Sequence, residues 1–257
     1  MTQNPWLSVP RPRAAPDLRL FCFPFAGGSA SAFRGWGDAL DERVEIVALQ
    51  PPGRESRFAE PAITQMGALV ARICEALASS LDRPFVFFGH SLGALVSFEV
   101  ARALRRQGRP MPLAMIVSGR RAPQVPLGRP PFHRLDDAAL VSEIRKLGGD
   151  PHRLFDSEEM RALLLPVARA DFAVHDTHVH EDEHPLDVPI SVFGGLDDHT
   201  TNERNLRAWQ EQCVGPVSLS MFPGGHFFIE DARHDVLQAI AALLAQSIQA
   251  VAPAIAS

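Results

Sequence analysis

The chain has 257 residues, of which 46% are hydrophobic, and a formal net charge of −5 at pH 7. This length and apolar content suit a single α/β domain over residues 1–257 better than two independent domains. The acidic balance argues against a nucleic-acid partner, which would favour a basic surface. No stretch approaches eighteen apolar residues, so no membrane span and no membrane partner are expected.

The cysteine content indicates a reducing compartment. The three cysteines, Cys22, Cys74 and Cys213, include no C-x-x-C pair and leave an odd number. We therefore expect free thiols in a cytoplasmic protein rather than a disulfide framework. The N-terminus has no apolar run of the signal-peptide type. The chain has no tyrosine, which excludes a mechanism that uses tyrosine as an acid or base.

The N-terminal region combines an extended lead with a first strand. Residues 1–17 are rich in proline and arginine and should lie extended over the surface, anchored at Trp6 and Leu7. A strand over 18–23 is followed by the glycine-rich loop 25–29. Such a loop is commonly only a turn. Directly after a first strand it can also supply a backbone N–H to an oxyanion, so both interpretations stay open.

Short apolar runs alternate with helical patterns along most of the chain. The expected strands are 18–23, 44–49, 85–88, 113–118, 190–193 and 217–222. The expected helices outside the long insertion described below are 32–40, 64–81, 92–107, 201–213 and 231–248. This alternation predicts a mostly parallel central sheet with helices on both faces.

A G-x-S-x-G motif stands between the strand at 85–88 and the helix at 92–107. In the sequence Gly89-His90-Ser91-Leu92-Gly93, small residues on both sides of the serine allow a strand and a helix to meet at a sharp turn. The turn exposes the serine hydroxyl at a helix N-terminus, which favours negative charge. The motif predicts Ser91 as a nucleophile, against the alternative of a mere tight turn.

A long insertion separates the strands at 113–118 and 190–193. It far exceeds the dozen or so residues that a parallel crossover requires. It contains two helical patterns, over 136–147 and 157–172. An insertion that leaves the sheet near a reactive serine suggests a helical lid, over residues 120–185. The alternative is a structural extension with no role in substrate choice.

An acid and a base for the serine follow two late strands. A serine hydroxyl is a poor nucleophile unless a base accepts its proton and a third group orients that base. Ser91, Asp198 and His226 occur in the order used by α/β-hydrolases. Since parallel strands bring their following loops to one sheet edge, the three are expected to meet. Asp197 is a weaker candidate for the acid; His199 and His90 are weaker candidates for the base.

A second motif points to a metal but lacks the right context. Residues 180–184 match H-E-x-x-H, the zinc-protease signature. That chemistry needs both histidines on one face of a buried helix. Here His184 precedes Pro185, which disfavours helical backbone, and the stretch is polar or acidic. No P-loop and no dinucleotide fingerprint occurs. We therefore expect neither a metal site nor a cofactor.

Several motifs in order resemble the type II thioesterases of polyketide and nonribosomal peptide synthesis. They are FCFPFAGGS at 21–29, PGRE at 52–55, GHSLG at 89–93 and PGGH at 223–226, together with KLGGDP at 146–151, LLLP at 163–166 and RADF at 169–172 in the insertion. The similarity runs from about residue 6 to residue 245. One departure is Phe25, where many members of that family have histidine; it keeps the backbone donor but alters the pocket wall.

The resemblance implies an α/β-hydrolase fold and a thioesterase that acts on carrier proteins. It would release acyl or aminoacyl groups from the phosphopantetheine arm and so clear stalled or misprimed synthases. By resemblance, Ser91 attacks the thioester, His226 takes its proton and Asp198 orients the imidazole. The backbone N–H groups of Ala26 and Leu92 would meet the oxyanion. The resemblance also implies a cytoplasmic monomer whose partners are acyl or peptidyl carrier domains.

Two matters stay open. Five arginines are candidates for a surface that docks an acidic carrier domain, with a solvated helix face and turn as the alternative: Arg105, Arg106, Arg109, Arg120 and Arg121. A carboxylesterase or an acyltransferase would use the same three catalytic residues, and a catalytically idle scaffold would need none of them.

Overall fold

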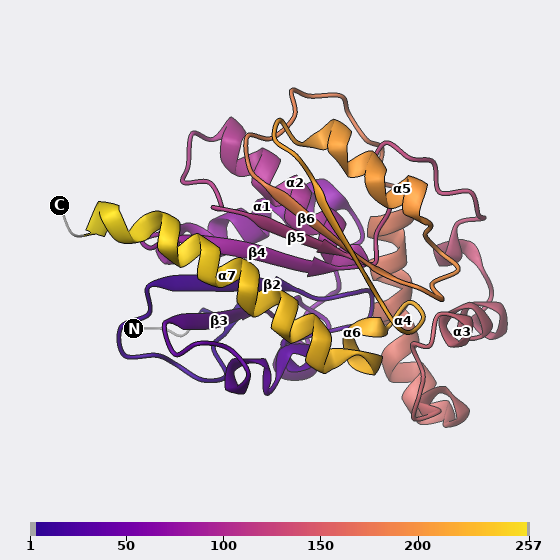
Figure 1. The fold of residues 1–257 in the computed structure, drawn as a ribbon. Coiled ribbons are helices and arrows are strands. Elements are labelled where there is room, and N and C mark those ends of the chain that lie inside the picture. Colours follow the sequence, from indigo (N-terminus) through magenta and orange to yellow (C-terminus); the bar gives the residue numbers. More distant parts are fainter. Residues whose placement is uncertain (1–3, 256–257) are drawn as a thin grey trace.

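A seven-stranded sheet runs through the molecule (Figure 1). The computed structural model describes residues 4–255, with side chains described to residue 250, so the ends of the predicted 1–257 domain lie outside the described residues. The strands follow the order β1-β3-β2-β4-β5-β6-β7, and only β1 is antiparallel to its neighbour. They are β1 (Leu7–Ser8), β2 (Leu18–Phe23), β3 (Val44–Leu49), β4 (Phe85–His90), β5 (Met115–Ser118), β6 (Ile190–Gly195) and β7 (Ser218–Phe222).

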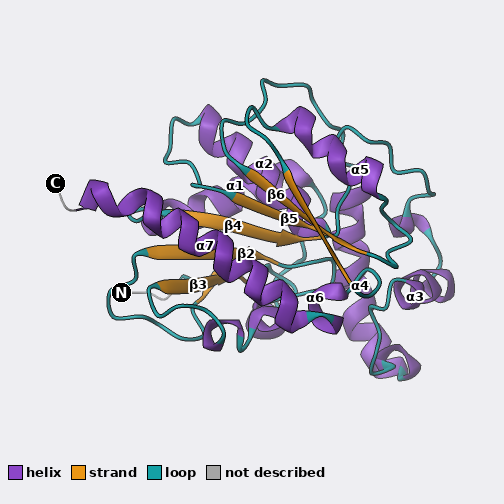
Figure 2. Ribbon diagram, viewed as in Figure 1, coloured by secondary structure: helices purple, strands orange, loops and turns teal. Residues whose placement is uncertain are grey.

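Helices cover both faces of this sheet, as predicted. They are α1 (Met66–Leu77), α2 (Leu92–Arg106), α3 (Asp137–Lys146), α4 (Glu158–Asp176), α5 (Glu203–Arg207), α6 (Phe228–Asp231) and α7 (Arg233–Ile255). In Figure 2, α7 crosses one face and α1 and α2 lie behind the other. Successive strand residues point to opposite faces, so Phe87 packs under α1 and α2 while Phe88 packs under α7. The predicted α/β architecture is confirmed.

The six strands expected from the sequence are all present, and β1 is an addition. Two residues carry no recognisable alternation, so β1 could not be predicted from its pattern. It pairs with β3, Leu7 opposite Leu49. The neighbouring Trp6 is buried and lies 4.2 Å from the guanidinium carbon of Arg57, measured to the ring centroid. The lead at 1–17 is therefore anchored at Trp6 and Leu7, as expected, for the part of it that the structure describes.

The predicted helix at 32–40 is wrong. Two short 3-10 turns, Ala30–Phe33 and Trp36–Asp38, replace it. Gly35 separates them at φ +77°, a left-handed conformation that ends a helix. The helix expected at 231–248 is present as α7, and the short helix α6, which precedes it, was not predicted. The helix expected at 201–213 is α5 followed by a short 3-10 helix, Ala208–Gln212. None of the described helices combines the length and apolar character that crossing a membrane demands.

The insertion forms two helices beside the carboxyl ends of the strands (Figure 1). These are α3 and α4, at the places where the sequence predicts helices. They bury a small apolar cluster of their own, which includes Phe155 and Phe172. Pro166 lies inside α4. The single-domain assignment and the lid boundaries 120–185 stay predictions.

Candidate active site

Ser91 occupies a strained turn between β4 and α2. Its backbone has φ +55° and ψ −113°, a conformation that is rare for a residue with a side chain and typical of functional sites. A Cβ on Gly89 would lie 2.3 Å from the Gly93 carbonyl oxygen, and one on Gly93 would lie 2.0 Å from that of Phe23. Both glycines are therefore required for β2, β4 and α2 to pack this closely.

His226 joins Ser91 to Asp198. Its Nε2 lies 2.9 Å from the Ser91 hydroxyl and its Nδ1 lies 2.9 Å from a carboxylate oxygen of Asp198. The three come from the loops after β4, β6 and β7, whose parallel strands end at one sheet edge. The structure thus brings together the three side chains that the sequence singled out. A hydrogen-bonded Asp-His-Ser set can activate a hydroxyl for attack on a carbonyl.

Thr200 completes the surroundings of the carboxylate. Its backbone N–H and its hydroxyl donate to one oxygen of Asp198, at 2.8 and 2.7 Å. Burial alone would raise the pKa of Asp198, but the hydrogen bond and charge of His226, together with the bonds from Thr200, lower it below its usual value. The carboxylate is therefore ionised at neutral pH. Sequence reasoning did not single out Thr200.

The rival residues lie elsewhere. Asp197 and His199 are exposed, whereas Asp198 is buried. His90 is fully buried with its ring centroid 5.3 Å from that of His226, but its Nδ1 lies 2.9 Å from the hydroxyl of Ser118 rather than near that of Ser91. Burial, and then the charge of His226, depress the pKa of His90 well below its ordinary value, so the ring is neutral.

In the loop after β2, two successive N–H groups have partners within the chain, and the one that precedes them, that of Ala26, has none among the described residues. Gly27 donates to a carboxylate oxygen of Asp171 at 2.7 Å, and Gly28 donates to the carbonyl of Phe25 at 2.9 Å. Among the described residues, none accepts a hydrogen bond from the backbone N–H of Ala26. Leu92 begins α2, where N–H groups have no partner within the helix. Ala26 and Leu92 both line a cavity beside Ser91, where the oxyanion role was expected.

A buried ion pair fastens this loop to the insertion. Arg54 makes two bonds to the carboxylate of Asp171 on α4, at 2.6 and 2.8 Å, and also donates to the carbonyl of Gly28 at 2.9 Å. Both side chains are only 8% exposed. Two stretches that the sequence singled out as family motifs, PGRE and RADF, thus meet at one contact. Their pairing was not predicted, because they are more than a hundred residues apart.

An apolar cavity of about 380 Å³ opens between Ser91 and the insertion. Leu164, Ala168 and Phe172 of α4 line it, with Ile144 of α3. Phe25, the departure from the family pattern, forms part of its wall, as expected. Volumes of this order and apolar walls suit the acyl part of a substrate.

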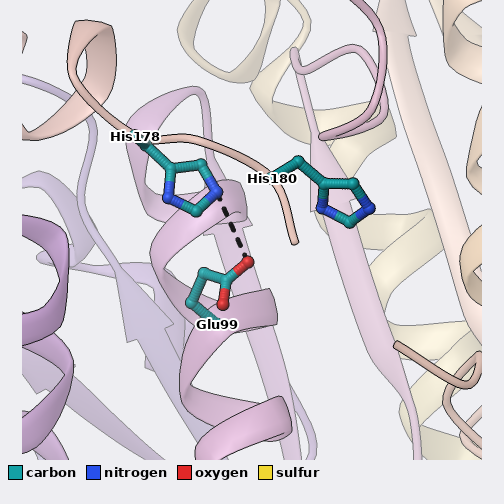
Figure 3. Close-up of side chains that lie close together, drawn as sticks. All are labelled: Glu99, His178 and His180. Atoms are coloured by element: carbon teal, nitrogen blue, oxygen red, sulfur yellow. Dashed lines mark ion pairs between the residues drawn. The ribbon is translucent and has the colours of Figure 1, made fainter. Parts of the chain in front are cut away.

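The H-E-x-x-H stretch has irregular backbone and is not helical. One of its histidines instead joins a different group, because candidate ligand atoms of Glu99, His178 and His180 all lie within 4.8 Å of one another. Figure 3 shows His178 directed at Glu99, at 3.4 Å. The Glu99 carboxylate also bonds to Arg102 at 2.9 Å, and that charge opposes a cation. Glu99 follows Ser91 by eight residues along α2, which corresponds to a rise of about 12 Å along the helix axis.

The five arginines do not form one docking patch. Arg120 and Arg121 are buried, at 9% and 8% exposure. Arg105 and Arg106 pair with Glu183, so they hold the end of the insertion against α2. Arg109 donates to the carbonyl of Cys74 at 2.9 Å. The five therefore do not offer one exposed basic surface, because Arg120 and Arg121 are buried and Arg105 and Arg106 are paired with Glu183.

Comparisons with known proteins give the same picture. A family model described as a thioesterase domain matches residues 18–244. The chain is 38% identical over 235 residues to the gramicidin S biosynthesis protein GrsT of Aneurinibacillus migulanus, covering 91% of this chain and 92% of that protein. It is 36% identical over 232 residues to thioesterase PikA5 of Streptomyces venezuelae, covering 90% and 82%.

Solved structures of thioesterases also resemble this chain. The RedJ thioesterase from the prodiginine biosynthetic pathway of Streptomyces coelicolor superposes with a TM-score of 0.84 at 36% identity, covering 91% of this chain and 96% of that one. The type II thioesterase BorB from the borrelidin biosynthetic cluster gives 0.82 at 31% identity, covering 94% and 97%. The chain therefore belongs to the thioesterase family, as a thioester hydrolase of the α/β-hydrolase fold related to the type II thioesterases.

Proposed function

We propose that this enzyme hydrolyses acyl or aminoacyl thioesters on the phosphopantetheine arm of carrier proteins, and so clears stalled or misprimed polyketide or nonribosomal peptide synthases. The observation that carries the proposal is the position of His226, within 2.9 Å of both Ser91 and Asp198 at the mouth of an apolar cavity. The names of two similar solved structures, the type II thioesterases of the borrelidin cluster and of the yersiniabactin NRPS/PKS pathway, support the choice of substrate.

In the first half-reaction, the Ser91 oxygen attacks the thioester carbonyl while His226 Nε2 takes its proton. Asp198 holds the imidazole in the tautomer whose Nε2 is free to accept and stabilises the imidazolium that forms. The N–H groups of Ala26 and Leu92 donate to the oxyanion; removal of one such donor costs about 2.7–4 kcal/mol in a serine protease. The imidazolium then returns the proton to the leaving pantetheine sulfur, whose thiol resembles a cysteine side chain, with a pKa of about 8–9.

In the second half-reaction, His226 takes a proton from water, which attacks the acyl-serine carbonyl. The same N–H pair receives the second oxyanion, and its collapse releases the acid and regenerates Ser91. The apolar cavity under α3 and α4 holds the acyl chain during both steps. The proposal needs no resident cofactor and no metal, because the chain's own side chains supply each proton transfer.

The proposal extends to how the enzyme works in the cell. We infer a cytoplasmic monomer that meets carrier domains of separate synthases. Its three cysteines are buried free thiols, which fit a reducing compartment. The molecular mass measured by sedimentation at micromolar concentration tests the monomeric state, because a dimer would have twice the mass of one chain.

The test compares acyl groups on a carrier protein, as free pantetheine thioesters and as oxygen esters, with Ser91→Ala as control. We expect the highest kcat/KM on carrier-bound thioesters and no turnover by Ser91→Ala. A preference for oxygen esters would favour a carboxylesterase, and transfer to an added acceptor in place of hydrolysis would favour an acyltransferase. Absence of turnover on every substrate would contradict the proposal.

A further inference from the structure

Two histidines and a glutamate meet where the insertion ends and returns to the sheet. Glu99 lies on α2, and His178 and His180 lie in the segment that follows α4 (Figure 3). One candidate ligand atom of each lies within 4.8 Å of the others. None of the three lines the acyl cavity or the smaller cavity beside Ser91. The group is therefore separate from the candidate active site.

Two imidazole nitrogens of this group are buried without a partner. Neither Nε2 of His178 nor Nδ1 of His180 has a hydrogen-bond partner among the described residues. The side chain of His180 is only 9% exposed. His178 Nε2 lies 3.4 Å from a carboxylate oxygen of Glu99, longer than the about 2.7–3.2 Å of a good hydrogen bond. Buried polar atoms normally have partners, so two neighbouring unpartnered nitrogens point to a group that binds between them.

The chain presents both imidazoles to the same helix. Exposure alternates along the segment, because Thr177 and Val179 are exposed whereas His178 and His180 are not. Residues at this spacing in a non-helical segment point to one side, here the side of α2. The segment is fastened further along by Glu183, which bonds to Arg105 of α2 at 2.8 Å. The three side chains are thus held by a buried helix and by a segment tied to it, as a preorganised site requires.

The charges around the group balance. Arg102 lies 2.9 Å from Glu99, where it opposes a cation, but it also lies 2.7 Å from Glu183. The second nitrogen of the His180 ring faces Asp182 at 3.6 Å, which leaves Nδ1 directed away from that carboxylate. Three arginines and three carboxylates, whose formal charges cancel, make up the charged surroundings: Arg102, Arg105, Arg106, Glu99, Asp182 and Glu183. The site is therefore not positive before an ion enters.

We propose that Glu99, His178 and His180 bind a zinc ion, which fastens the end of the insertion to α2. Two imidazoles and one carboxylate are a ligand set that zinc uses, with water in the fourth position. With bonds of about 2.1 Å, the ligand atoms of a tetrahedral zinc ion lie about 3.4 Å apart. The separation of Glu99 and His178 already has this value, and rotation of the His180 ring brings in the third ligand.

The ligand types also select the kind of ion. Imidazole nitrogens favour zinc and similar transition ions over magnesium or calcium, which prefer oxygen ligands. A ligating carboxylate is commonly held by a further hydrogen bond, and Arg102 supplies one to Glu99. Of the two histidines in the H-E-x-x-H stretch, only His180 belongs to the site; His184 is exposed. The ion would thus act as a clip between two segments and not in the hydrolysis at Ser91.

The test measures metal binding directly. Untagged protein treated with a chelator is titrated calorimetrically with zinc chloride and with magnesium chloride. We expect one zinc ion to bind per chain at micromolar concentration, with a rise in the melting temperature that is complete at one equivalent, and no binding of magnesium. His178→Gln and His180→Gln should each weaken zinc binding by at least about tenfold, the loss that outer-shell changes already cause at metal sites. His184→Gln is the matched control and should bind zinc like the unaltered chain.

Cobalt(II) provides a second measurement that needs no variant. Bound to this site in place of zinc, it should show the strong visible absorption of a four-coordinate ion, which aqueous six-coordinate cobalt lacks. Thermal unfolding in the presence of chelator verifies that each variant folds. Absence of stoichiometric zinc binding would overturn the proposal and leave His178 and Glu99 as a simple ion pair. Binding that neither His178→Gln nor His180→Gln weakens would place the ion on a surface histidine and would also overturn it.

Discussion

Two adjacent aspartates of the same turn have opposite surroundings. Asp198 is buried and accepts hydrogen bonds from His226 and Thr200, while Asp197 is exposed. The backbone N–H of Asp197 donates to the carbonyl of Gly224 at 3.0 Å, so the turn with the acid is tied to the turn with the base. The direction in which this turn leaves β6 therefore determines which of the two aspartates contacts the imidazole of His226.

Asp198→Asn should lower kcat by roughly 10³–10⁴-fold, by analogy with the effect of the same change in a serine protease. An amide in this position favours the tautomer that places a proton on Nε2, where it cannot accept one from Ser91. Single-turnover kinetics on an acyl-carrier substrate measure the loss. Asp197→Asn is the matched control and should stay within about twofold of the unaltered enzyme. Similar losses in both variants would mean that the acid is misassigned.

Among the elements, the turn between β4 and α2 depends on glycine more than any other. A Cβ on Gly93 would lie 2.0 Å from the Phe23 carbonyl oxygen, whereas one on the exposed Gly67 of α1 has no heavy atom within 4 Å. The same substitution should therefore have opposite effects in two helices of one chain.

We expect Gly93→Ala to destabilise the fold by several kcal/mol, because β2 and α2 must separate to admit the methyl group. Gly67→Ala should raise the free energy of unfolding by up to about 1 kcal/mol, since alanine favours helix over glycine. Urea titrations followed by circular dichroism provide both numbers. A Gly93→Ala protein as stable as the unaltered chain would show that the turn has room that the structure lacks.

The elements that could be predicted are those whose own residues determine them. The buried strand Leu18–Phe23 and the helix after Ser91 carry continuous patterns, and both were found. The break at Gly35 could not be seen, because a glycine inside a helical pattern is compatible with either outcome. Contacts between distant residues could not be predicted either. Arg105 pairs with Glu183, 78 residues away, and no local sequence pattern indicates that pairing.

At the scale of the whole molecule, buried histidines make stability depend on pH. Burial is the first cause that holds the pKa of His90 well below its usual value and lowers that of His175 to about 3. An unfolded chain protonates both near pH 6.5. The stability that these neutral rings contribute is therefore fully present above pH 6.5 and is lost progressively as the pH falls toward their folded pKa values.

Between pH 7 and pH 5 each of the two histidines should cost about 2 kcal/mol of folding free energy. Urea unfolding at the two pH values measures the difference. His175→Gln should reduce that difference by about 2 kcal/mol, whatever its effect on stability at either pH alone. The exposed His199→Gln should leave it unchanged. An undiminished difference in His175→Gln would contradict the assignment of a neutral buried ring.

The ion pair of Arg54 with Asp171 constrains how substrates can enter. It fastens the rear half of α4 to the loop that carries Ala26, so this half cannot swing outward without dismantling the proposed oxyanion donor. Pro166 interrupts the hydrogen-bond ladder of α4 just ahead of that fastened half, because it has no N–H. If the insertion opens to admit an acyl chain, as the predicted lid would, the movement must therefore lie in α3 and in the part of α4 ahead of Pro166.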